Sequence, residues 1–126
     1  MPKKILDAPS GPAPVGPYSV VTEANGFVFV SGQGAIDPAT GQLAGDGVEA
    51  ETEQVMKNIG AILADVGLEY SDIVKTTIFL TDMGDFPAVN AIYGKYVADA
   101  KPARSTVEVA GLPLGMLVEI ELIAAR

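Results

Sequence analysis

The sequence predicts an α+β fold, a two-layer sandwich in which one β-sheet carries two helices. Short runs rich in β-branched and aromatic residues, bounded by turn residues, occur at both ends of the chain and once in its middle. Two other segments repeat apolar residues at the helical spacing of three and four. The resulting order is β-β-α-β-α-β-β. At 126 residues and 48% hydrophobic content, the chain has material for one domain, residues 1–126.

A β-hairpin opens this pattern. Residues 18–22 and 27–31 flank Asn25 and Gly26, the dipeptide most typical of a type I′ turn between antiparallel strands. Glycine and proline then indicate loop and turn as far as Gly47.

Two helices follow from the apolar spacing. In the first, residues 48–66, one buried stripe is expected to hold Val55, Ile59, Ile62, Leu63 and Val66, and Gly67 ends the helix. The second helix follows the turn at residues 82–85 and is expected to hold Val89, Ile92, Tyr93, Tyr96 and Val97, with Pro102 at its end. Acidic residues at the start of the first helix, Glu49, Glu51 and Glu53, are interpreted as a solvated face favoured by the helix dipole.

The later strands are expected at residues 73–80, 104–109 and 117–124. Alternate side chains of a strand point to opposite faces, so the sequence separates two sets. The set expected beneath the helices is Val28, Val30, Ser105, Val107, Val109, Val118, Ile120 and Leu122. The other set is Phe27, Phe29, Ser31, Arg104, Thr106, Glu108, Leu117, Glu119, Glu121 and Ile123. This second face is too apolar to stay in water, so we expect other copies of the chain to cover it in a symmetric homo-oligomer.

Composition narrows the possible functions. The formal net charge of −8 repels phosphate backbones and anionic membranes, so nucleic acid and membrane partners are not expected. The chain has no cysteine and no histidine, which removes thiol nucleophiles and the usual zinc and haem ligands, and no metal is expected. No signal peptide or membrane-spanning run is recognisable, and we expect a cytoplasmic protein.

Several short motifs occur in collinear order from about Pro9 to the C-terminus. They are Gly16-Pro17-Tyr18-Ser19, Val30-Ser31-Gly32-Gln33, Asn58-Ile59, Val89-Asn90-Ala91-Ile92-Tyr93, Pro102-Ala103-Arg104-Ser105, and Leu112-Pro113 through Glu119-Ile120-Glu121. Together they resemble the reactive intermediate deaminase (Rid, or YjgF) family.

The resemblance implies a chorismate-mutase-like fold, a homotrimer, and active sites between subunits. It also implies cofactor-independent hydrolysis of 2-imino acids, or their enamine tautomers, to 2-oxo acids and ammonia. Such imines are products of pyridoxal-phosphate-dependent dehydratases.

By the same resemblance, Arg104 binds the substrate carboxylate and Glu119 positions the water, with Tyr18 as a third catalytic position. The supporting substrate-binding positions are Ser31, Gly32, Phe86, Asn90, Thr106 and Pro113. Thr106 stands where well-studied members have a cysteine, so thiol catalysis is excluded and a backbone contribution is implied. Glu51 stands where glutamine is common and is interpreted as a surface change.

Other interpretations remain open at this stage. Arg104 and Glu119 could form a structural ion pair across neighbouring strands. Tyr18 could be a half-buried strand aromatic, and Asn90 could bond locally. At the level of function, the alternative is a non-catalytic trimeric module that binds or senses a small acid in the same cleft. Endoribonuclease activity, a third reading, is disfavoured by the negative charge and the missing histidine.

Overall fold

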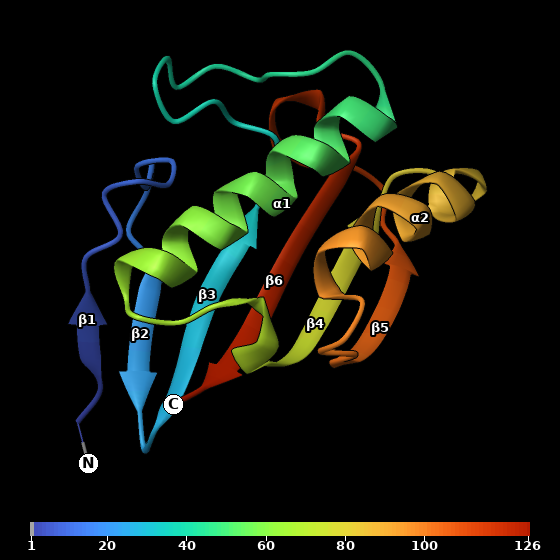
Figure 1. Ribbon diagram of the computed structural model, residues 1–126. Helices are drawn as coiled ribbons and strands as arrows, with labels where there is room; N and C mark the ends of the chain where they lie inside the picture. The colour runs from blue at the N-terminus through green and yellow to red at the C-terminus, as the bar shows by residue number, and fades with distance from the viewer. Residues whose placement is uncertain (1) are drawn as a thin grey trace.

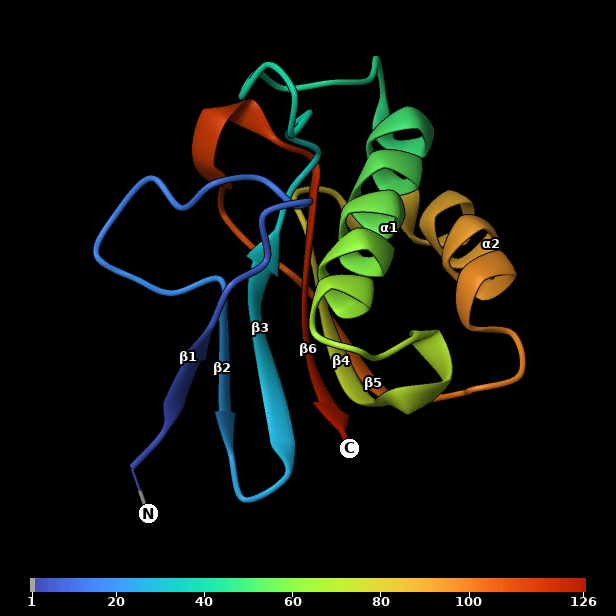
Figure 2. The same ribbon diagram turned by 60° about the vertical axis from the view of Figure 1, so that its left-hand side comes forward.

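A computed structural model describes residues 2–126 and shows one six-stranded mixed sheet with two helices on one face (Figures 1 and 2). The strands are β1 (Lys4–Leu6), β2 (Val21–Ala24), β3 (Phe27–Gln33), β4 (Ile73–Leu80), β5 (Ala103–Glu108) and β6 (Val118–Ala125). The helices are α1 (Val48–Asp65) and α2 (Phe86–Val97), with single 3-10 turns η1 (Tyr70–Asp72), η2 (Met83–Asp85) and η3 (Pro113–Gly115). The order across the sheet is β1-β2-β3-β6-β4-β5, and β4 with β5 is the parallel pair. The predicted α+β two-layer class is confirmed.

The predicted hairpin is confirmed, with Asn25 at φ 53° and Gly26 at φ 81°, as a type I′ turn requires. Strand β1, which pairs with β2 at the edge of the sheet, was not predicted. It is only three residues long and lies between prolines, so no alternating pattern could develop. The second helix ends at Val97, before the proline expected to end it.

The core lies between the helices and one face of the sheet. Four of the five predicted α1 stripe residues, Val55, Ile59, Ile62 and Leu63, are buried, whereas Val66 follows the end of the helix and is partly buried. They meet Val28, Val30, Val118, Ile120 and Leu122, which are also buried. Figure 1 shows α1 crossing β3 and β6 while α2 lies over β4 and β5.

The side chains of strand β5 lie on the opposite faces of the sheet from those predicted. Arg104 pairs with Thr76 and Thr106 pairs with Ile78, and both β4 partners are buried under the helices. Arg104, Thr106 and Glu108 therefore lie on the helix side. The prediction failed because β5 is an edge strand whose two faces are both largely exposed, so its sequence has no apolar alternation to read.

The face away from the helices exposes Phe27 and Phe29, as predicted, and also Val107, which was predicted on the helix side. Phe27 is 45% exposed, and Phe29 and Val107 are each 41% exposed. A shallow hollow of about 520 Å³ lies on this face, lined mainly by β3, β4 and β6. We call this surface, carrying Phe27, Phe29, Val107, Glu119 and Glu121, the open face. Within the described residues no helix covers it (Figure 2).

Candidate active site

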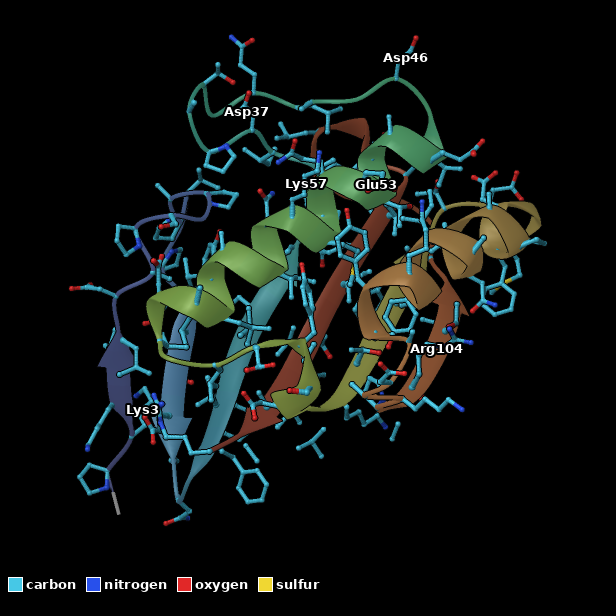
Figure 3. All side chains as sticks on the ribbon, viewed as in Figure 1. Lys3, Asp37, Asp46, Glu53, Lys57 and Arg104 are labelled. Carbon is cyan, nitrogen blue, oxygen red and sulfur yellow. The ribbon has the colours of Figure 1, made fainter. Side chains whose placement is uncertain are left out.

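The Arg104 side chain lies against α2, in a position defined by three contacts. Its Nη1 donates to Oδ1 of Asn90 at 2.6 Å. Its guanidinium carbon is 5.2 Å from the ring centroid of Phe86 and 5.3 Å from that of Tyr93. Two aromatic faces hold a planar cation in place without consuming its donors. Figure 3 shows Arg104 on β5 beside α2, at the edge of the sheet.

Helix periodicity explains why α2 can supply these partners. Phe86 and Asn90 are four residues apart, and Tyr93 follows three later, so all three lie on one side of the helix. The side chain of Asp82 accepts from the N–H of Gly84 at 2.8 Å and shapes the turn before the helix. The same turn is tied to the end of β5, because the Met83 N–H donates to a carboxylate oxygen of Glu108 at 2.7 Å.

Tyr93 joins the sheet to the helix beneath the arginine. Its hydroxyl and that of Thr76 are 2.8 Å apart in a buried hydrogen bond. Burial raises the pKa of Tyr93, while the Thr76 bond and the Arg104 charge act in the opposite direction. A neutral phenol with a raised pKa adds no competing negative charge beside Arg104.

Thr106 lies next to this group on the same side of β5. Its Oγ1 is buried and has no hydrogen-bond partner within the described residues. We refer to Phe86, Asn90, Arg104 and Thr106 as the Arg104 cluster.

A second cluster lies on the open face, where β3 and β6 meet. A methyl group on Gly32 would overlap the carboxylate of Glu119, so this side chain rests directly on the Gly32 backbone. The pairing of β3 with β6 is irregular between Val30 and Gln33, which places Gly32 at the irregularity. Burial raises the pKa of Glu119, and the neighbouring Glu121 raises it further.

Ser31 completes the Glu119 cluster, which we define as Ser31, Gly32 and Glu119. The Ser31 Oγ donates to the backbone oxygen of Ser19 at 2.6 Å. The side-chain amide of Gln33 donates to the Ser31 backbone oxygen at 3.0 Å. The first bond ties the irregular part of β3 to the loop before β2, and the second lies within β3.

Within residues 2–126, neither Tyr18 nor Pro113 makes a hydrogen bond to a member of either cluster. Tyr18 is 48% exposed in the loop before β2, and its hydroxyl accepts a long bond of 3.4 Å from the Val15 N–H. Pro113 begins η3, followed by the exposed Leu114 at φ 59°. The interpretation of Tyr18 as a half-buried strand aromatic is therefore wrong, because it lies outside any strand.

The two clusters do not meet within one chain. Arg104 points to the helix side, Glu119 lies on the open face, and β4 separates their strands. The salt bridges among the described residues are Lys95–Glu53 and Arg126–Glu23. The alternative of an intrachain ion pair between Arg104 and Glu119 is therefore wrong.

Glu51 is not the surface residue that the sequence predicted. It is only 3% exposed, and one of its carboxylate oxygens accepts from the Leu117 N–H at 2.9 Å. The only sequence signal was its place among other acidic residues in the first turn of α1, which is equally typical of a solvated helix start.

Residues 2–126 contain no group of three or more acidic side chains placed to hold a metal ion. In the same part of the chain, no helix combines the length and the apolar character that crossing a membrane requires.

The fold and the two clusters define a small α+β domain with an exposed arginine held against α2 and a carboxylate on an apolar face. The profile of the endoribonuclease L-PSP family matches residues 8–126. A RutC family protein of Synechocystis is 52% identical over 126 residues, covering 98% of this chain and 97% of its own. The 2-iminobutanoate/2-iminopropanoate deaminase of Mus musculus is 43% identical over 124 residues, covering 98% of this chain and 92% of its own.

Among solved structures, a Rid-family protein of unknown function from Yersinia pestis matches with a TM-score of 0.95 and 45% identity. The match covers 99% of this chain and all (100%) of that one. The chain therefore belongs to the endoribonuclease L-PSP family, also called the Rid or YjgF family.

Proposed function

We propose that this protein hydrolyses 2-imino acids, or their enamine tautomers, to 2-oxo acids and ammonia without a cofactor. The observation that carries this proposal is the environment of Arg104. Phe86, Tyr93 and Asn90 orient its guanidinium, yet the two salt bridges of the described residues both lie elsewhere. An oriented fork of donors without an acidic partner is suited to bidentate binding of a small carboxylate. The deaminase activity named for the mouse relative supports the same chemistry.

The site requires two subunits, because Arg104 and Glu119 lie on opposite faces of the sheet. In our proposal, the β5 edge of one subunit lies across the open face of the next, which brings the Arg104 cluster of one copy to the Glu119 cluster of its neighbour. Covering the exposed Phe27 and Phe29 supplies a hydrophobic driving force for this contact. Three such contacts close a homotrimer.

The mechanism follows from the positions of the two charged groups. Arg104 holds the substrate carboxylate, which fixes the electrophilic C2 one bond away. Glu119 of the neighbouring subunit accepts a proton from water as the water oxygen bonds to C2, and the C=N electrons pass to nitrogen. Glu119 then returns the proton to nitrogen. Collapse of the resulting carbinolamine moves the hydroxyl proton to nitrogen through Glu119, forms the C=O bond and breaks the C–N bond, which releases ammonia and leaves the 2-oxo acid.

The moderate rate acceleration that this reaction needs is consistent with a site that has only one acid–base group. These imines hydrolyse in water unaided, so the protein needs only a moderate further reduction of the barrier. One general acid–base group contributes about 10²–10⁴-fold, and orientation of the substrate contributes as well. The raised pKa of Glu119 favours a group that both takes and returns a proton.

The alternative is a trimeric module that binds the acid without turning it over. It needs Arg104 but gives Glu119 no role in proton transfer. Endoribonuclease activity, which the family description names, fits poorly with a net charge of −8 and a chain without histidine. A cytoplasmic location stays a prediction of the sequence.

The test couples a serine or threonine dehydratase to the purified protein and follows 2-oxo acid formation in a buffer free of amines. We expect the wild type to accelerate formation, Glu119→Gln to abolish the acceleration, and Glu49→Gln, an exposed acid on α1, to retain it. Wild-type protein that binds a small 2-oxo acid but accelerates no imine derived from alanine, butyrate or a larger acid would establish the binding module instead.

A further inference from the structure

One face of α1 holds buried polar side chains that bond to backbone groups of the sheet layer. Glu51, in the first turn, accepts from the Leu117 N–H at 2.9 Å. Seven residues later, on the same face of the helix, Asn58 is also buried. Its side-chain amide donates to the backbone oxygens of Ile36 at 2.8 Å and Gly34 at 3.3 Å.

The segments that these two side chains hold lead directly to the Glu119 cluster. Gly34 follows Gly32 by two residues, and Leu117 precedes Glu119 by two residues. The segments also touch each other, because a methyl group on Gly34 would overlap the sulfur of Met116. Helix α1 therefore fixes both backbone segments that bring Gly32 and Glu119 into contact.

Leu117 is held from two sides at the start of β6. Its N–H donates to Glu51, and its backbone oxygen accepts from the Thr81 N–H at 3.2 Å. Without an acceptor on α1, the part-buried Leu117 N–H would lose this partner. A shift of the backbone at Leu117 would carry the residues that follow with it, and Glu119 is the second of them.

The buried Glu51 contributes little to the net folding stability of the protein. Burial of an acid side chain without a cationic partner is costly. Two compensations are visible. The hydrogen bond from the Leu117 N–H and the positive end of the α1 dipole both favour the Glu51 carboxylate. These gains only offset the cost of burial. We therefore expect Glu51 to affect the position of Leu117 more than the free energy of unfolding.

We propose that Glu51 is a positioning residue for Glu119: its carboxylate anchors Leu117 and thereby sets how the Glu119 side chain rests against Gly32. The expected effect on catalysis rests on the proposed function, whereas the position of the Glu119 side chain can be measured without turnover.

The test compares Glu51→Met, which keeps the volume without a comparable acceptor, with Glu51→Gln, which keeps an acceptor oxygen. Glu49→Met is the matched control, because Glu49 is an exposed acid in the same helical turn. Three quantities are measured: hydrogen exchange of the Leu117 amide, the carboxyl titration of Glu119 by NMR, and kcat with KM for imino acid hydrolysis.

We expect Glu51→Met to remain folded, to exchange the Leu117 amide at least about tenfold faster, and to lower the titration midpoint of Glu119 toward that of an exposed carboxyl. We also expect kcat to fall about tenfold or more with little change in KM, because a small displacement of the reacting group is costly. Glu51→Gln should restore all three quantities, and Glu49→Met should change none.

An unchanged Glu119 titration in folded Glu51→Met, despite fast exchange at Leu117, would overturn the proposal, as would an unchanged kcat. If Glu51→Met does not fold, the test rests on Glu51→Gln. This variant must keep the wild-type Leu117 exchange rate and Glu119 titration, and a change in either would contradict the proposal. Wild-type protein without imine hydrolysis would refute the proposed function, and the exchange and titration data would still decide the role of Glu51.

Discussion

Arg104 and Glu119 leave opposite faces of one sheet, with β4 between the strands that carry them. The arginine is held against α2, and the carboxylate rests on Gly32 at the open face. Within a single chain they cannot contact the same small molecule. In the proposed homotrimer, a second copy covers the open face and brings its Arg104 cluster to the Glu119 cluster.

Replacing Arg104 with lysine should weaken substrate binding although the charge is kept. Lysine has no planar fork for a carboxylate and cannot stack between Phe86 and Tyr93 in the same way. We expect kcat/KM to fall at least about 30-fold, which corresponds to a loss of about 2 kcal/mol of transition-state stabilisation. Thermal unfolding should change little, because Arg104 is exposed in the single chain. A variant with wild-type kcat/KM would remove Arg104 from the site.

Glu119→Gln should be more stable than the wild type at neutral pH. The folded state raises the pKa of Glu119 through burial and the charge of Glu121, so it binds the proton more tightly than the unfolded chain does. Wild-type stability therefore falls as pH rises from the usual value of 4.5 to the raised value, and the loss is complete above it. Glutamine avoids this loss. Melting temperatures of the two proteins should differ at neutral pH and converge below pH 4.5.

The same raised pKa predicts the pH dependence of turnover. Glu119 must be ionised to accept a proton from water, so kcat should rise with pH through a midpoint above 4.5. A pH–rate profile in a non-amine buffer measures this midpoint. A profile that is flat from pH 4.5 upward would contradict the role of Glu119 as the base.

Gly32→Ala should impair turnover without unfolding the protein. Its methyl group would occupy the place of the Glu119 carboxylate, which must then rotate away. A displacement of about 1 Å costs on the order of 10²-fold in rate. Gly111→Ala is the control, since nothing lies within 4 Å of a methyl group there. Equal kcat values for the two variants would show that the contact between Gly32 and Glu119 has no catalytic importance.

Thr106→Val should leave activity intact and stabilise the fold slightly. The Thr106 hydroxyl is buried and has no hydrogen-bond partner among residues 2–126, and valine has nearly the same shape without that unsatisfied group. We expect a gain of about 1 kcal/mol in the free energy of unfolding, measured in denaturant. A marked loss of kcat/KM would instead show that the hydroxyl itself contacts the substrate.

The elements with strong periodicity were predictable from the sequence. The α1 stripe and strand β4 have the apolar spacing of buried elements, and Asn25 with Gly26 marks the hairpin. Strand β5 lacked such a pattern because it is an edge strand, and the facing of Arg104 was therefore predicted wrongly. That error hid the separation of Arg104 from Glu119.

The buried position of Glu51 could not be predicted either. Its partner is the backbone N–H of Leu117, and a backbone group leaves no trace in the choice of side chain at its position. The grouping of Arg104 with Phe86 and Asn90 was implied only by the family resemblance and not by the residue spacing. Spacing along the chain does not indicate which face of an edge strand meets α2.

The most direct test of a site shared between subunits is complementation of Arg104→Ala by Glu119→Ala. Each variant alone should be nearly inactive. Refolded together in equal amounts, about three quarters of random trimers are mixed, and each holds one intact site. The mixture is therefore predicted to have about a quarter of wild-type activity. A mixture no more active than the separate variants, despite mixed trimers in native mass spectra, would contradict the account.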